Sequence, residues 1–272
     1  MSAAVYGHAV RQVVRATLIV SVGAAAFCYL VLLSSSLFIQ DFAGPGGQVP
    51  EFFRTPPKAI EAFLGGSADF FSAEGWLSAA LLHPVILSLQ TVGAVMVASG
   101  AVAAELERGS LDLVLTRPVG RGPFLMGKAL ASLTTVTAVH AGALAGALLA
   151  RVWVDGVDAI PVGSMLTTFA GSWALFSALS MIALLISTRS SLRGRSVGAA
   201  VAVVVGSFFL NFMALLFDDI AGLRYASPFH YFRPADILSG DPYLPDLLVL
   251  VALGAVSLLG ALWWFGRRDL TR

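Results

Sequence analysis

The chain has 272 residues, of which 57% are hydrophobic and only 12% are charged, and its mean hydropathy is +0.84. Soluble domains carry about 25% charged residues, so this composition excludes an ordinary soluble domain and indicates a protein embedded in a lipid bilayer. The 17 basic and 16 acidic residues nearly cancel. A broad positive field is therefore missing, which argues against nucleic acid as a partner.

Six stretches without Asp, Glu, Lys or Arg are long enough to cross a bilayer, which takes roughly 17 to 25 apolar residues. They cover residues 16–39, 75–104, 129–150, 159–188, 196–217 and 247–266. The second and fourth stretches are too short to hold two spans, so we place one helix in each, at 84–104 and 165–188. The sequence therefore predicts an all-α integral membrane protein with six transmembrane helices in a single domain, residues 1–272.

The basic residues predict the orientation, because Lys and Arg are retained on the cytoplasmic side. With the N-terminus inside, both termini are cytoplasmic, and the long loops 40–82 and 218–246 lie outside. Twelve of the 17 basic residues then fall in cytoplasmic segments: Arg11, Arg15, Arg108, Arg117, Arg121, Lys128, Arg189, Arg193, Arg195, Arg267, Arg268 and Arg272.

Residues 3–15 combine an apolar face with a basic face, a pattern typical of a helix that lies along a membrane surface. The alternative is a simple N-terminal extension of the first span. Cys28 lies within that span and has no second cysteine to pair with. We interpret it as apolar filling rather than a disulfide or metal ligand.

In the first outer loop, Pro56 and Pro57 can open a short helix that Gly65 and Gly66 end. Ile60, Phe63 and Leu64 share one face of it. The five carboxylates of this loop have no metal-ligand spacing, and we interpret them as solvated charges. In the last outer loop, the aromatic run at 227–234 is interpreted as interfacial packing, with a gate over an exit route as the alternative.

Residues 105–121 form the longest inner loop and mix charge with leucine. Gly109 and Ser110 can end one helix and cap another, which then presents Leu111 and Leu115 on an apolar face until Pro118 stops it. Such a helix is suited to insertion into a groove on a partner protein. The alternative is a helix that floats at the lipid headgroups.

Gly122, Gly127 and Lys128 match the spacing of a phosphate-binding loop. We reject ATP binding here because Ala129 replaces the Ser or Thr that holds Mg²⁺, Pro123 removes a backbone N–H, and no strand precedes the loop. Lys128 is instead predicted to snorkel as the inner anchor of the third span.

The expected spans contain few polar side chains. Gln90, Thr91, Ser207 and Asn211 lie near mid-span, where they can face a transport pathway or hydrogen-bond neighbouring helices. His140 is the one titratable residue in the spans, and we expect an interhelical hydrogen bond rather than a proton relay.

Gly142 and Gly146 in the third span form a G-x-x-x-G motif that permits a close helix contact. No catalytic motif or metal-ligand spacing is present in the sequence, so an enzyme is not expected.

The run Ala104-Glu-Leu-Glu-Arg-Gly-Ser-Leu-Asp-Leu-Val-Leu-Thr-Arg-Pro-Val-Gly-Arg121, followed by Gly127 and Lys128, resembles the membrane subunit of type-2 ABC exporters. Ser227-Pro-Phe-His-Tyr and Arg267-Arg-Asp-Leu270 are also similar to this family. The resemblance implies an elbow helix at 3–15 and a coupling helix within 105–121 that docks on a separate ATPase. The contact residues so implied are Glu105, Glu107, Arg108, Gly109, Leu111, Leu113, Leu115, Arg117, Pro118 and Arg121.

The resemblance further implies two ATPase subunits, which bind ATP and Mg²⁺ themselves, and a second permease copy or a homologous permease. The route would run between the permeases, lined by the first, second and fifth spans. The uncharged spans favour an amphipathic or apolar cargo. The 15 Arg against two Lys favour a bacterial source, and hence the cytoplasmic (inner) membrane.

Two alternatives remain from the sequence alone. One is a membrane subunit of an ABC-type complex that serves metalloenzyme maturation. The other is an ATP-independent secondary carrier, which should show an ion-coupling residue or two inverted halves, and neither is found.

Overall fold

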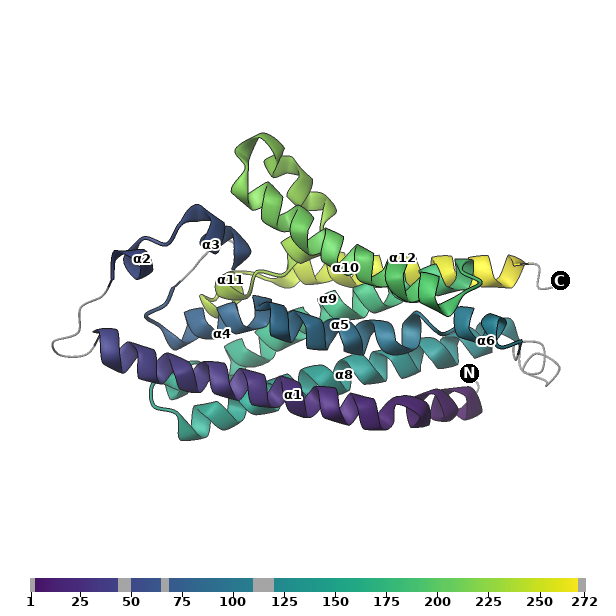
Figure 1. The fold of residues 1–272 in the computed structure, drawn as a ribbon, viewed down its shortest axis with the longest axis horizontal. Coiled ribbons are helices and arrows are strands. Elements are labelled where there is room, and N and C mark those ends of the chain that lie inside the picture. Colours follow the sequence, from purple (N-terminus) through teal and green to yellow (C-terminus); the bar gives the residue numbers. More distant parts are fainter. Residues whose placement is uncertain (1–2, 44–49, 65–68, 110–119, 269–272) are drawn as a thin grey trace.

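The computed structural model describes residues 3–43, 50–64, 69–109 and 120–268, and this part of the chain folds into helices joined by short segments. Five of its helices are long and apolar enough to cross a membrane. They are α1 (Ala3–Ala43), α8 (Arg121–Trp153), α9 (Val162–Arg189), α10 (Arg193–Leu216) and α12 (Leu244–Arg267). Together with a sixth, bent segment described below, they form an elongated bundle (Figure 1). The all-helical membrane fold is confirmed.

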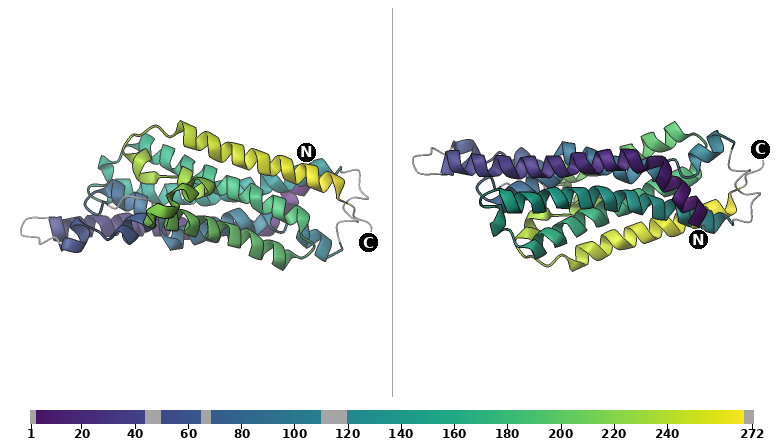
Figure 2. Two further views of the ribbon diagram at one scale, coloured as in Figure 1. Left: turned by 90° about the horizontal axis from the view of Figure 1, so that it is seen from above. Right: turned by 90° about the horizontal axis from the view of Figure 1, so that it is seen from below.

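The two ends of the bundle differ in what they carry. The first residues of α1, the last residues of α12 and the short helix α6 (Ala103–Glu107) share one end, which we call the terminal end (Figures 1 and 2). The opposite end, the loop end, carries four short helices: α2 (Glu51–Arg54), α3 (Lys58–Phe63), η1 (Val157–Ala159) and α11 (Pro234–Leu238). The last turns of α10 and the 3₁₀-helix η2 (Asp218–Ala226) project from the side, and η3 (Pro228–Tyr231) returns the chain toward α12.

The second span is broken rather than one straight helix over 84–104. Helix α4 (Ala73–Leu82) meets α5 (Pro84–Ala98) at a bend of 50°, and α6 follows after a turn. Pro84 cannot donate a backbone hydrogen bond, so α4 ends before it, while the His83 Nδ1 accepts from Val85 N at 3.2 Å and caps α5. The residues of the uncharged stretch that precede Pro84 therefore form a helix of their own, α4, outside the predicted span 84–104.

The amphipathic N-terminal segment is continuous with the first span, although α1 bends near its N-terminus (Figure 2). Its apolar face packs on the bundle, because Ala9 is buried against Val97 and Ala131. Tyr6 Oη lies 3.1 Å from Thr134 Oγ1 on α8. The start of α1 is thus held by α5 and α8 through its apolar face.

The closest helix contact joins α1 to α8. A Cβ placed on Gly142 would lie 2.4 Å from the Ser21 carbonyl oxygen, and one on Gly146 would lie 2.0 Å from the Ala25 carbonyl oxygen. Real Cβ atoms do not approach backbone so closely, so only glycine fits at both positions. The predicted close contact through the G-x-x-x-G motif is confirmed.

Neutral hydrogen bonds link α8 to α9. His140 Nε2 lies 3.2 Å from Ser172 Oγ, and the Ser132 and Ser180 hydroxyls lie 2.5 Å apart. The predicted interhelical hydrogen bond of His140 is therefore confirmed.

Two smaller predictions are also confirmed. Cys28 is buried in the apolar core. The short helix α3 begins directly after Pro57.

We predict that Gly146→Ala destabilises the bundle by about 1 to 3 kcal/mol, because the new methyl group forces α1 away from α8. Gly206→Ala is the matched control, since a Cβ at Gly206 on α10 meets open space and alanine favours helix by about 1 kcal/mol. Thermal unfolding of the purified protein in detergent measures both. Equal unfolding temperatures for Gly146→Ala and the wild type would contradict the close contact.

Candidate functional site

A buried ion pair joins α6 to α8 at the terminal end. The Lys128 Nζ donates to the Glu105 Oε1 at 3.0 Å, and the two residues are 6% and 8% exposed. Arg108 contacts the same Glu105 oxygen at 3.4 Å. Lys128 therefore does not snorkel to the membrane surface as predicted, because Glu105 offers it a charged partner inside the protein.

A serine of α9 holds the start of α6. The Ser187 Oγ accepts hydrogen bonds from the backbone N–H groups of Val102 and Ala103, each at 3.1 Å. The first N–H groups of a helix lack intrahelical acceptors, so this hydroxyl satisfies two donors that would otherwise be buried without partners. The break in the second span is therefore stabilised by a residue from a different helix.

The end of α6 is fixed by two further features. Gly109 follows the last turn with φ of 66°, the left-handed conformation that commonly ends helices. The prediction that Gly109 ends a helix is confirmed. The Glu107 Oε2 accepts from the backbone N–H of Arg193 at 2.8 Å, so a carboxylate sits at the positive N-terminus of α10.

Two arginines connect the ends of α8, α9 and α12 through hydrogen bonds to backbone carbonyl oxygens. Arg121, the first residue of α8, donates to the carbonyl oxygens of Gly266 at 3.2 Å and Arg268 at 2.7 Å. Arg268 in turn donates to the carbonyl oxygens of Thr188 and Ser190 at the end of α9. Both side chains satisfy helix C-terminal carbonyls. Burial lowers the pKa of Arg268 from its usual value.

These contacts define the terminal junction, which connects α6, α8, α9, α10 and α12. It consists of Glu105, Glu107, Arg108, Arg121, Lys128, Ser187, Arg193 and Arg268. Of the residues that the sequence assigns to ATPase docking, four charged ones lie in the junction and Gly109 borders it. Leu111, Leu113, Leu115, Arg117 and Pro118 lie outside the described residues. Sequence reasoning missed Ser187, Arg193 and Arg268 as members of this site.

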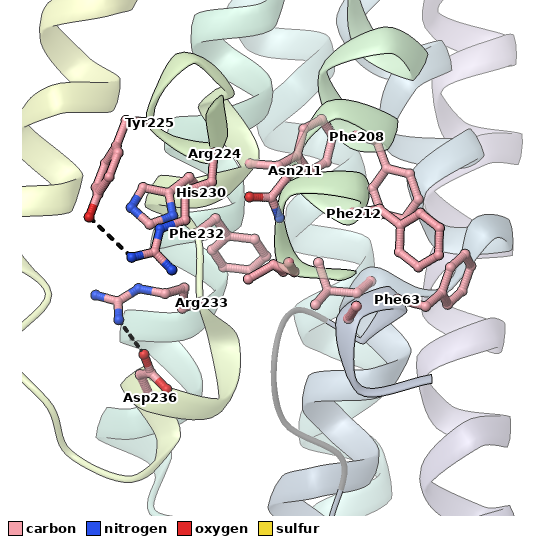
Figure 3. Close-up of a pocket in the computed structure, with 14 residues that line it drawn as sticks. Phe63, Phe208, Asn211, Phe212, Arg224, Tyr225, His230, Phe232, Arg233 and Asp236 are labelled. Carbon is pink, nitrogen blue, oxygen red and sulfur yellow. Dashed lines mark hydrogen bonds and ion pairs between the residues drawn. The ribbon is translucent and has the colours of Figure 1, made fainter. Parts of the chain in front are cut away.

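The four polar candidates for a pathway fall into two groups. Gln90 is fully buried, with no hydrogen-bond partner among the described residues, and the Ser207 hydroxyl donates to the Val203 carbonyl of its own helix. Thr91 lines an apolar cavity of about 380 Å³ between α5 and α10. Asn211 lines a second cavity, of about 440 Å³, at the loop end (Figure 3). Thr91 and Asn211 therefore each line a cavity, whereas Gln90 and Ser207 line neither of these two.

A double-mutant cycle tests the buried pair. We predict that Glu105→Gln destabilises the protein by about 3 to 5 kcal/mol, since it leaves the buried Lys128 ammonium without its carboxylate partner. Lys128→Met should destabilise it less, because the Arg108 guanidinium still contacts Glu105. The double variant should be less destabilised than the sum of the two. Thermal unfolding measures all four proteins, and strictly additive losses would show that the two side chains do not interact.

The sequence is similar to those of known membrane transport proteins. A family model for ABC-2 family transporter proteins matches residues 5–270. The chain is also similar to the probable ABC transporter permease protein NosY of Pseudomonas aeruginosa, with 33% identity over 161 residues. That match covers 58% of this chain and 55% of NosY, so the chain spans about half the length of this relative. Because the family model covers nearly the whole chain, the protein belongs to the ABC-2 family as a membrane-spanning permease subunit.

Proposed function

We propose that the chain forms the transmembrane route of an ATP-driven exporter for an amphipathic or apolar small molecule. Membership in the ABC-2 family implies a partner ATPase subunit and favours this function over an ATP-independent carrier. In the proposed complex, two copies of the ATPase bind ATP and Mg²⁺, and this chain pairs with a second copy of itself or with a homologous permease. The complex lies in the inner membrane of a bacterium.

The terminal end faces the cytoplasm in this proposal. Basic residues from α6, α8, α9 and α10 gather there, and Lys and Arg are enriched on the cytoplasmic side of membrane proteins. They include Arg108, Arg121, Arg189 and Arg193. The loop end, which carries most of the acidic residues, then faces outward.

One observation supports the proposal most directly. Residues 110–119 connect two helices, α6 and α8, whose side chains form the contacts of the terminal junction. Glu105 and Arg108 precede this segment, and Arg121 and Lys128 follow it. An ATPase that pushes on the segment therefore acts on α6 and α8 at once, and through their partners on α9, α10 and α12. Separating the buried charges is costly, so the junction moves as a body.

The apolar cavity between α5 and α10 supports the choice of cargo. These helices belong to the second and fifth spans, two of the three that are expected to line the route. The cavity wall combines aliphatic side chains with Phe208, Phe209 and Phe229, and Thr91 and Ser88 add hydroxyl groups to it. Ligand pockets of this kind are mostly apolar with few polar groups.

Docking by residues 105–121 is tested with Leu111→Asp combined with Leu115→Asp. Two carboxylates on the apolar face should remove contacts that fill the ATPase groove, and we expect at least a tenfold loss of ATPase that copurifies with the tagged permease. The measurement is the ratio of the two subunits after coexpression and affinity purification.

The matched control is Ile220→Asp combined with Leu223→Asp, which places the same charges on exposed residues of η2, which projects from the bundle beside the loop-end helix α3. This control should retain the ATPase at the wild-type ratio. Retention by both double variants would exclude residues 105–121 as the docking segment, and loss in the η2 variant alone would reverse the proposed orientation.

A further inference from the structure

The second cavity, which we call the outer pocket, lies at the loop end between α3, α10, η2, η3 and α11 and has a volume of about 440 Å³. Its two sides differ in chemistry (Figure 3). Phe63, Phe208 and Phe212 line one side, and charged and imidazole groups line the other. The charged side consists of Arg224, His230, Arg233 and Asp236, with Asn211 between the two sides.

The two arginines of the outer pocket are in different electrostatic states. Arg233 donates to Asp236 at 2.6 Å and to Asp246 at 2.9 Å, so two carboxylates neutralise it, and the hydrogen bond to Asp246 raises its pKa. Arg224 has no carboxylate within ion-pair distance among the described residues. It therefore brings an uncompensated positive charge to the pocket.

Arg224 also has unused hydrogen-bonding capacity. One terminal nitrogen donates to the Tyr225 Oη at 3.1 Å, and the guanidinium lies 5.1 Å from the centre of the Tyr225 ring. Its Nε is buried and has no acceptor in the described structure. The second terminal nitrogen, Nη1, also makes no hydrogen bond among the described residues, and an anionic oxygen in the pocket would supply the acceptor that it lacks.

His230 adds a neutral group to the same side. Burial lowers its pKa, and so do the positive charges of Arg224 and Arg233, which favours the uncharged imidazole. It offers one donor and one acceptor. The cation available to a ligand is then Arg224.

Asn211 completes the polar side of the outer pocket. It is nine-tenths buried, and its Oδ1 has no donor among the described residues. An amide can donate to one ligand oxygen and accept from a ligand hydroxyl. A phosphate monoester presents both, because it carries anionic oxygens and, near neutral pH, a fraction of P–OH groups.

The apolar cavity adjoins the outer pocket. Phe63, Phe208 and Phe229 line both. Beyond this shared wall the apolar cavity continues between α5 and α10, where its lining carries no charged residue. A polar site thus lies beside an apolar one about 380 Å³ in volume, the arrangement that an amphipathic ligand requires.

We propose that the two adjoining cavities bind an amphipath that has a phosphate head group and an apolar tail. Arg224 and Asn211 hold the head group in the outer pocket, and the tail lies between α5 and α10. The inference goes beyond the proposed function, because binding at this site requires neither an ATPase nor transport.

The test measures binding of radiolabelled dodecyl phosphate to the full chain in phosphatidylcholine nanodiscs, with binding to empty nanodiscs subtracted. We expect saturable binding that weakens at least tenfold in Arg224→Met and in Asn211→Leu. Arg224→Lys keeps the charge and should stay within about threefold of the wild type. Arg54→Gln is the matched control, since it removes an exposed cation on α2 that does not line the pocket, and its binding should equal the wild type.

Competition identifies the ligand class. Unlabelled dodecyl phosphate should displace the label, whereas dodecyltrimethylammonium and inorganic phosphate should need at least tenfold higher concentrations. Equal displacement by the cationic amphipath would overturn the role of Arg224, and equal displacement by inorganic phosphate would overturn the tail site. Wild-type binding by Arg224→Met, or absence of saturable binding, would overturn the proposal while leaving ATPase docking unaffected.

Discussion

Glu105 and Lys128 are oppositely charged residues that lie buried in the described bundle, and their side chains form an ion pair. A carboxylate or ammonium group left alone in an apolar interior loses its hydration without compensation. The end of α6 and the first turns of α8 must therefore stay together. Residues 110–119 connect these two helices in the sequence, so the buried pair joins the helices on either side of that segment. The remaining junction contacts extend this constraint to three more helices.

The rest of the bundle is held by different means. Gly142 and Gly146 let α1 and α8 approach to backbone contact, and hydroxyl and imidazole groups link α8 to α9. In a bilayer, such close packing and neutral hydrogen bonds replace the hydrophobic effect as the source of helix association. The bundle thus combines a neutral, closely packed interior with ion pairs at both ends, and the buried ion pair lies at the terminal end. Such a bundle is suited to move as one rigid body when an ATPase applies force at the terminal end.

The sequence predicted most of what depends on local patterns. The uncharged stretches predicted the long helices, and Gly109 predicted the end of a helix. Gly142 and Gly146 predicted a close helix contact. Each of these features depends on local composition or residue spacing. The break after Ala98 was missed because Ser99 and Gly100 lie inside an apolar stretch. Its stabilising hydroxyl, Ser187, comes from a helix that is distant in the sequence.

The other differences between the prediction and the structure arise from contacts between residues that are distant in the sequence. Lys128 was assigned to the membrane surface because its position at the start of a span is typical of snorkelling, and only the fold brings Glu105 to it. The outer pocket was likewise not predicted, since its arginines, Asn211 and the phenylalanines come from separate elements. The aromatic run at 227–234 was interpreted as interfacial packing or a gate. In the structure, part of this run lines the outer pocket.

The central claim is that the partner ATPase binds the bundle at the terminal junction. Photo-crosslinking in intact cells tests it most directly, with p-benzoylphenylalanine in place of Leu113 or, as the comparison, in place of Ile220 on η2. The account predicts that the ATPase subunit is captured from position 113 and not from position 220. Capture from position 220, or no capture from position 113 in a complex that hydrolyses ATP, would contradict it.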